Sequence, residues 1–341
     1  MAQADFQALL NDRPWLLADG ATGTTFFAMG LMSGDAPELW NVDNIDNVKA
    51  LHNGFIEAGA DIILTNSFGG TAYRLKLHNA QTRVGELNSA AARIARECAD
   101  AVDRPVIVAG SMGPTGEIFA PVGTLSHEDG VAAFREQALA LKDGGADVLW
   151  LETISSEEEL RAAVEGASAA GLPIVSTMSF DTNGRTMMGI TPAAFGLLTA
   201  ALPQQLTAIG ANCGTGASEL VATVLGITEA RPEAIVVAKG NCGIPAYVDG
   251  HIHYSGTPEL MADYARLALD AGARIIGGCC GTGPDHLKAM RESLETYEGG
   301  PRPSVEVIEA RLGEVSALAH GHDVAAEAAA AGGRRSRRRR G

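Results

Sequence analysis

The sequence predicts an α/β fold, a (β/α)8 TIM barrel, from its apolar runs, their spacing and the glycines that precede them. Eight short runs rich in Val and Ile alternate with longer amphipathic segments, as parallel strands alternate with crossover helices. Gaps of about 20 to 45 residues each hold one helix with its loops, and the whole set has the length of a closed barrel. The expected strands are residues 15–18, 61–65, 105–110, 147–152, 173–178, 206–211, 234–240 and 273–278.

The joins between helices and strands support this fold. The segments AGAD (58–61), GGAD (144–147) and AGAR (271–274) each lead directly into a strand, and glycine there suits a left-handed helix C-cap. A doubly wound open sheet also alternates strands and helices. Eight strands without a clear second domain favour closure into a barrel.

Composition indicates a globular chain that forms one large domain or two smaller ones. Of the 341 residues, 46% are hydrophobic and 20% are charged, so the chain can bury a large core. Apolar stretches stay below the roughly 18 residues of a membrane span, and the first residues carry acids where a signal peptide would carry bases. We expect a cytoplasmic protein whose barrel domain covers residues 1–318.

The last residues differ in charge from the rest. Six arginines lie within residues 334–341, and without them the chain has 20 basic and 41 acidic residues, a net charge of −21. Such a body repels nucleic acid and membranes, which the basic tail alone could contact, non-specifically. We expect residues 319–341 to form a disordered Ala/Gly/Arg-rich tail, the alternative being an arm that binds a partner or RNA.

The distinctive residues of the chain follow the expected strands. In a TIM barrel the chemistry lies at the carboxyl ends of the strands, where eight loops converge. We therefore expect one site from Asp19, Gly20, Thr65, Asn66, Gly110, Ser111, Glu152, Cys213, Asn241, Cys279 and Cys280.

Three of the five cysteines form a candidate metal site. Cys213 lies in GANCGTG, and Cys279 and Cys280 lie in GGCCGTG, so no zinc-finger CxxC is present. Adjacent residues of a straight strand point to opposite faces, and the pair can share an ion only if the chain turns there, as the flanking glycines permit. Three thiolates suit Zn²⁺ and leave a fourth position open, as in catalytic sites. The alternative is three buried structural cysteines.

These motifs resemble those of the homocysteine S-methyltransferase family, which includes betaine-homocysteine methyltransferases and the homocysteine-binding module of cobalamin-dependent methionine synthase. The double cysteine between glycine pairs is the most specific match, and the resemblance extends from residue 16 to about 290. The matching stretches are LLADGATGT (16–24), ILTNSFGGT (63–71), GSMGPTGE (110–117), FDTNGRTMMG (180–189), GANCG (210–214), KGNCGIP (239–245) and GGCCGTGPDHL (277–287).

The resemblance implies zinc-dependent methyl transfer to homocysteine, which forms methionine. A free thiol with a pKa of about 8.5 is mostly protonated near neutral pH. Bound at the open position, the substrate sulfur would be ionised, and three cysteine thiolates would keep it electron-rich.

The rest of homocysteine carries an ammonium and a carboxylate that need fixed partners. We expect Glu152 to bind the ammonium, and Asp19 with the Gly20 and Ala21 amides to bind the amino-acid end. A salt-bridged structural acid and a tight strand–helix turn are the alternatives. The expected substrate contacts are Asp19, Gly20, Ala21, Thr65, Asn66, Ser111 and Glu152.

Four further residues near the motifs, Asn241, Cys242, His251 and His253, are considered as metal ligands. The resemblance implies that Asn241 approaches zinc when substrate is absent, so it is grouped with Glu152 as catalytic. Cys242 stands where the family has alanine and is expected to be packed away. The HxH pair, His251 and His253, is expected in a loop rather than on a metal.

Betaine or a related onium compound is the expected methyl donor. Aromatic faces bind a quaternary ammonium best, yet Gly69 and Thr153 stand where vertebrate betaine enzymes have tyrosines, so Trp40, Tyr73 or Tyr247 would have to substitute. We expect the sequence to hold a single barrel, with no room for a cobalamin module. The alternative is therefore the homocysteine-activating subunit of a split methionine synthase, with a separate methylcobalamin carrier protein as partner.

Two other classes of protein fit the cysteines. One is a non-enzymatic zinc-binding scaffold, whose metal would have four protein ligands. The other is a thiol-redox enzyme that uses Cys279 and Cys280, although adjacent cysteines lack CxxC geometry.

Overall fold

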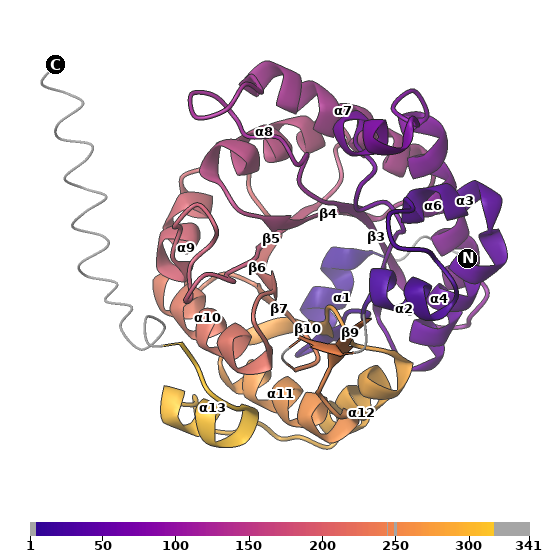
Figure 1. Ribbon diagram of the computed structural model, residues 1–341. Coiled ribbons are helices and arrows are strands. Elements are labelled where there is room, and N and C mark those ends of the chain that lie inside the picture. Colours follow the sequence, from indigo (N-terminus) through magenta and orange to yellow (C-terminus); the bar gives the residue numbers. More distant parts are fainter. Residues whose placement is uncertain (1–4, 244, 249–250, 317–341) are drawn as a thin grey trace, which may run out of the picture.

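The computed structural model describes residues 5–243, 245–248 and 251–316 and confirms the TIM barrel (Figure 1). Eight parallel strands follow one another in the order β1-β10-β7-β6-β5-β4-β3-β2, and each overlaps one expected run. They are β1 (Leu16–Leu17), β2 (Ile62–Leu64), β3 (Ile107–Met112), β4 (Val148–Ile154), β5 (Ile174–Met178), β6 (Ala208–Cys213), β7 (Val236–Gly240) and β10 (Ala273–Gly278).

Helices surround the strands (Figure 1). The longer ones are α4 (Ile45–Glu57), α6 (Val84–Asp100), α7 (His127–Asp143), α8 (Glu157–Ser168), α9 (Pro192–Ala200), α10 (Ala217–Ala230), α11 (Pro258–Asp270) and α12 (Pro284–Glu295). The shorter ones are α1 (Phe6–Asp12), α2 (Thr22–Ala28), η1 (Pro37–Leu39), α3 (Trp40–Asp43), α5 (Ala72–Leu75), η2 (Lys76–His78) and α13 (Val305–Leu312). As predicted, Gly59, Gly145 and Gly272 adopt left-handed conformations where helices end, with φ of +102°, +101° and +105°.

Both faces of the strands are buried, which explains their nearly continuous apolar sequences. Ile62 and Leu64 belong to the cluster inside the barrel, whereas Ile63 packs in the cluster between strands and helices. Helix α1 adds Phe6 and Leu10 to the interior cluster and lies across the centre of the ring in Figure 1. The barrel is therefore a packed core, and its site must lie beyond the strand ends.

An antiparallel strand pair, β8 (Pro245–Val248) and β9 (His251–Tyr254), is inserted between β7 and α11. The loop expected for His251 and His253 was wrong, because both residues lie in β9. The Asp-Gly pair at 249–250 is a hairpin signal that the sequence analysis did not use.

The boundary at residue 318 and the tail at 319–341 lie outside the described residues, so both stay predictions. Within the described part of the chain, no helix has the length and apolar character needed to cross a membrane.

The ring closes between β1 and β2 through few backbone contacts, because β1 has two residues. This junction between β1 and β2, here called the seam, has an isolated β-bridge between Ala18 and Ile62. Two buried carboxylates add to it: Asp61 Oδ2 accepts the Leu17 N–H at 2.9 Å, and Asp19 Oδ2 accepts the Leu64 N–H at 2.7 Å. Side chains thus supply hydrogen bonds that a longer strand pair would make through its backbone.

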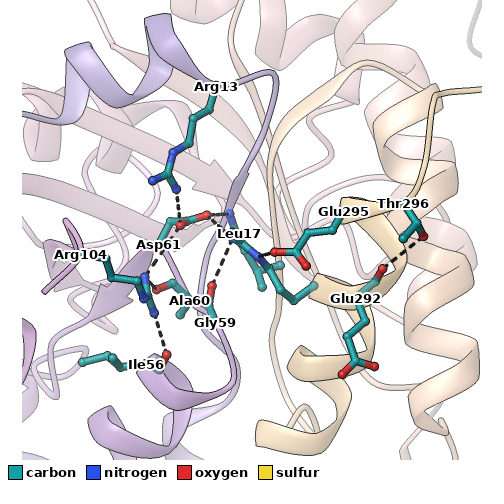
Figure 2. Close-up of polar contacts among 11 residues, drawn as sticks. Arg13, Leu17, Ile56, Gly59, Ala60, Asp61, Arg104, Glu292, Glu295 and Thr296 are labelled. Atoms are coloured by element: carbon teal, nitrogen blue, oxygen red, sulfur yellow. Dashed lines mark hydrogen bonds and ion pairs between the residues drawn. The ribbon is translucent and has the colours of Figure 1, made fainter. Parts of the chain in front are cut away.

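Asp61 also connects the seam to distant parts of the chain (Figure 2). Arg13, which follows α1, donates to Asp61 at 2.6 Å, and Arg291 of α12 donates at 2.9 Å. Arg104 lies 3.9 Å from the same carboxylate. The carboxylate therefore joins the first helix, the second strand and the last barrel helix.

Replacing Asp61 by asparagine should lower the free energy of unfolding by about 2 to 3 kcal/mol, because it leaves partly buried arginines without their counter-charge. Chemical denaturation checks this. Glu295→Gln is the matched control, since Glu295 pairs with Arg291 at 2.7 Å on the exposed side, and it should cost under about 0.5 kcal/mol. Equal losses in the two variants would show that Asp61 does not fasten the seam.

Candidate functional site

The structure brings the three predicted cysteines together at the carboxyl ends of β6 and β10. The Cys213 sulfur lies 2.9 Å from the Cys279 sulfur and 3.9 Å from the Cys280 sulfur. All three sulfurs lie within 4.8 Å of one another. Residues 66 positions apart in sequence thus offer one compact set of sulfur donors.

Backbone turns aim the three thiols at one point. Cys213 is the last residue of β6 and has a φ of +59°, a left-handed conformation that is uncommon for residues other than glycine. After β10 the chain turns at once, with Thr282 N–H donating to the Cys279 carbonyl at 3.1 Å and Gly281 at a φ of +80°. This turn allows Cys279 and Cys280 to share a site, as the glycine pattern predicted.

Asn241, just after β7, joins the two cysteine loops. Its Nδ2 donates to the Gly214 carbonyl at 2.7 Å, and its Oδ1 accepts the Cys280 N–H at 3.0 Å. Both ends of the amide are therefore used to hold the loops. The structure gives Asn241 a positioning contact, and its approach to a metal stays a prediction.

Asn212 was missed by the sequence analysis. Its Oδ1 accepts the Thr153 N–H at 2.9 Å and the Thr177 hydroxyl at 2.6 Å, and its Nδ2 donates to Thr153 Oγ1 at 2.8 Å. Thr153 has a φ of +62°, which is costly for a β-branched residue and persists where neighbours enforce it. Asn212 thereby fixes the end of β4, where Glu152 lies.

A cavity of about 500 Å³ opens beside the cysteines. The predicted contacts Gly20, Ala21, Thr65, Asn66, Ser111 and Glu152 all line it, together with Cys213, Cys279 and Cys280. Asp19 and Asn241 do not line it. Its other walls include Asp35, Glu38, Phe68, Arg74, His78 and Lys239.

The polar residues after β2 and β3 support the cavity wall. Thr65 Oγ1 accepts the Ser111 N–H at 3.0 Å. Asn66 donates to the Pro37 carbonyl at 2.7 Å and to Asn41 at 3.0 Å, so it holds the segment that contains η1 and α3. In this structure Asn66 shapes the wall.

Glu152 is a buried carboxylate that lines the cavity together with the three cysteines. Its side chain is buried, and the Ser111 hydroxyl donates to its Oε1 at 2.5 Å. Burial raises the pKa of Glu152 to about 7, and the nearby Cys279 adds to the increase, whereas Lys239 and the Ser111 hydrogen bond oppose it. A cationic ligand would favour the ionised form.

Both carboxylate oxygens of Asp19 contact other groups of the protein. Its Oδ1 lies 2.5 Å from the Lys239 Nζ, in addition to the contact of Oδ2 with Leu64, and both members of this ion pair are buried. The Ala21 N–H, which was expected to face the substrate, donates to the Thr282 carbonyl at 2.9 Å. Lys239 was missed, although a cation at the end of the apolar run AIVVAK is a visible signal.

The thiols differ in acidity. Hydrogen bonds from Cys213 and Cys279 lower the pKa of Cys280, and one from Tyr254 adds to this effect. Hydrogen bonding with Cys279 raises the pKa of Cys213. Tyr254, in β9, is a contact that the sequence analysis did not foresee, because it depends on the inserted hairpin.

The remaining two cysteines are buried apart from the cluster, as expected. Cys242 is buried outside the cluster, and burial raises its pKa to about 11. Cys98 is buried in α6. The side chains of His251 and His253 lie outside the described residues.

A (β/α)8 barrel whose strand ends gather three thiols and a buried carboxylate around one cavity has the donor set of a thiolate-ligated metalloenzyme. The same elements carry the motifs that define a family by sequence. The chain belongs to the homocysteine S-methyltransferase family, whose model matches residues 16–294.

Individual relatives agree with this assignment. The methionine synthase of Mycobacterium tuberculosis is 31% identical over 311 residues, and that of Mycobacterium leprae is 29% identical over 307 residues. These matches cover 86% and 85% of this chain but 25% of each relative, so the chain spans a quarter of their length. The metallated form of the Escherichia coli homocysteine methyltransferase MmuM is similar in structure, with a TM-score of 0.70 and 26% identity over 84% of this chain and 98% of that chain.

Proposed function

We propose that this protein is a zinc-dependent homocysteine S-methyltransferase that forms methionine. The observation that carries the proposal is the convergence of Cys213, Cys279 and Cys280 on one side of a cavity that also holds Glu152. Family membership supports methyl transfer to homocysteine.

The donor set fits zinc. With zinc–sulfur distances of about 2.3 Å and tetrahedral angles, ligand sulfurs lie about 3.8 Å apart. The separation of 3.9 Å between Cys213 and Cys280 matches that value, whereas Cys213 and Cys279 lie closer together, at 2.9 Å. Among the described residues the donor set has three thiolates, which leaves one position for the substrate and does not suit a scaffold site with four protein ligands.

We assign a role in the reaction to several of the residues around the cavity. Zinc, when bound to the three cysteines, supplies a Lewis acid that keeps the substrate sulfur ionised. Glu152 holds the substrate ammonium and orients the thiol for in-line attack. Asn241 and Asn212 keep the cysteine loops and the end of β4 in place through the hydrogen bonds described above.

The cavity favours a methylcorrinoid over betaine as the donor. Among the described lining residues, Phe68 is the only Phe, Tyr or Trp, so these residues do not form an aromatic cage for a quaternary ammonium. Of the expected substitutes, Trp40 packs on Phe26 with ring centroids 5.0 Å apart, Tyr73 lies beside Lys76, and neither lines the cavity. The Tyr247 side chain lies outside the described residues. The names of the relatives also support the methionine synthase type.

A donor comparison tests this choice. Methionine formation from homocysteine should be detectable with free methylcobalamin and should stay at background with betaine, dimethylsulfoniopropionate or S-methylmethionine. Mass spectrometry of methionine is the measurement, and a Cys279→Ala variant sets the background. Turnover with betaine at a rate above that with methylcobalamin would reverse the assignment and restore the onium donor as the physiological one.

A further inference from the structure

Asn212 is a fully buried amide near the end of β6, and its side chain reaches one sulfur of the cysteine cluster. Its Oδ1 accepts the N–H of Thr153 and the hydroxyl of Thr177. Its Nδ2 donates to Thr153 Oγ1 at 2.8 Å and to Cys279 Sγ at 3.9 Å. Among the described residues, Cys279 is the one cysteine of the cluster whose sulfur accepts an N–H.

An irregularity in β4 determines which way the Asn212 amide points. The pairing of β4 with β5 shifts register between Leu151 and Ile154, and Thr153 lies in this stretch with a φ of +62°. The Thr153 N–H donates to Asn212 Oδ1 at 2.9 Å. A backbone N–H is always a donor, so the amide oxygen must face Thr153. The amide nitrogen is therefore directed at Cys279.

The contact between Asn212 and Cys279 affects the reactivity of the sulfur. A buried N–H without an acceptor is costly, and an ionised sulfur is a stronger acceptor than a neutral thiol. The hydrogen bond in turn stabilises the charge on the sulfur and makes the thiolate a weaker nucleophile. The Asn212 amide therefore lowers the reactivity of Cys279 toward an electrophilic carbon.

This lower reactivity matters in methyl transfer, because a cysteine thiolate beside the substrate sulfur is itself a methyl acceptor. In that side reaction a lone pair of the Cys279 sulfur attacks the methyl carbon, and the electrons of the carbon's bond to the donor stay with the donor. The product is S-methylcysteine at position 279, a neutral thioether that no longer offers a thiolate to the metal.

We propose that Asn212 protects Cys279 from the methyl donor and thereby directs the methyl group to the substrate sulfur. This inference rests on the proposed function for the identity of the reaction. Asn212 is not among the residues that line the cavity, so it acts through Cys279 as a positioning residue.

Competition between two cysteines for methyl iodide tests this role. Zinc-loaded protein without substrate is treated briefly with methyl iodide, and peptide mass spectrometry gives the ratio of S-methylation at Cys279 to that at Cys213. In Asn212→Leu this ratio should rise roughly 3- to 10-fold, the effect of losing one hydrogen bond. Thr177→Val is the matched control, because it removes a hydrogen bond to Asn212 Oδ1 but keeps the N–H that faces Cys279. Its ratio should equal that of wild type.

Asn212→Asp is a second variant that keeps the test valid if leucine prevents folding. Aspartate keeps oxygen acceptors for Thr153 and Thr177 but offers no N–H to Cys279, so it should raise the ratio as leucine does. An unchanged ratio in the folded Asn212 variants, or an equal rise in Thr177→Val, would overturn the proposal. Methyl iodide replaces the physiological donor, and the ratio can also be measured on the metal-free thiols. The result therefore stands even if zinc binding or methyl transfer to homocysteine fails.

Discussion

Replacing Cys279 by alanine should remove stoichiometric zinc from the protein and reduce methionine formation to background. Two thiols then remain of a three-thiol set, and we expect zinc affinity to fall by more than about 100-fold. Because the turn after β10 is held by backbone hydrogen bonds, the barrel should still fold. Metal analysis, competition with a chromophoric chelator and circular dichroism measure the three quantities. Cys213→Ala and Cys280→Ala should behave in the same way.

Cys242→Ala is the matched control for these variants. Cys242 is adjacent in sequence to Asn241 and is fully buried, but its sulfur lies outside the cluster. The substitution should cost some stability, through the small cavity it leaves, and should keep zinc and activity. If Cys279→Ala keeps full zinc and turnover, or if Cys242→Ala loses both, the assignment of the ligands is wrong.

The sequence could predict the barrel because its signals are local. Strands buried on both faces must be apolar throughout, and runs such as PVIVAG leave little choice of structure. The hairpin β8–β9 was missed because HIHY has no apolar run, and its strands lie outside the main sheet. The closure of β1 on β2 through Asp61 was also hidden, since it depends on arginines 48 and 230 residues away in sequence.

The candidate site was predictable to the extent that its residues stand at strand ends. Cys213, Cys279 and Cys280 each follow a strand and carry a distinctive chemistry, and the structure brings them together. The roles of Asn212 and Lys239 depend on which side chains meet across the barrel. Asn212 reaches Thr153, 59 positions away, and Lys239 reaches Asp19, 220 positions away. In each pair one strand lies between the two partners, so the register of several strands sets these contacts, and spacing along the chain does not reveal them.

Glu152→Gln should weaken the binding of an amino-acid ligand and should abolish its pH dependence near neutrality. Burial raises the pKa of Glu152 to about 7, so the carboxylate is mostly protonated at pH 6 and mostly ionised at pH 8. An ammonium binds the ionised form, and affinity should therefore rise about tenfold from pH 6 to pH 8 in wild type. Glutamine keeps the contact with Ser111 but has no charge, so the variant should bind weakly and equally at both values.

Calorimetric titration of zinc-free protein with L-methionine measures this effect without interference from a substrate thiol. The variant should be at least as stable as wild type at pH 8. Because the folded-state pKa of Glu152 is raised, folding disfavours its ionised form at that pH, and the neutral amide avoids this cost. A weaker ligand affinity together with unchanged or higher stability separates a binding role from a structural one. An affinity that rises with pH in the variant as it does in wild type would assign the ammonium contact to another group.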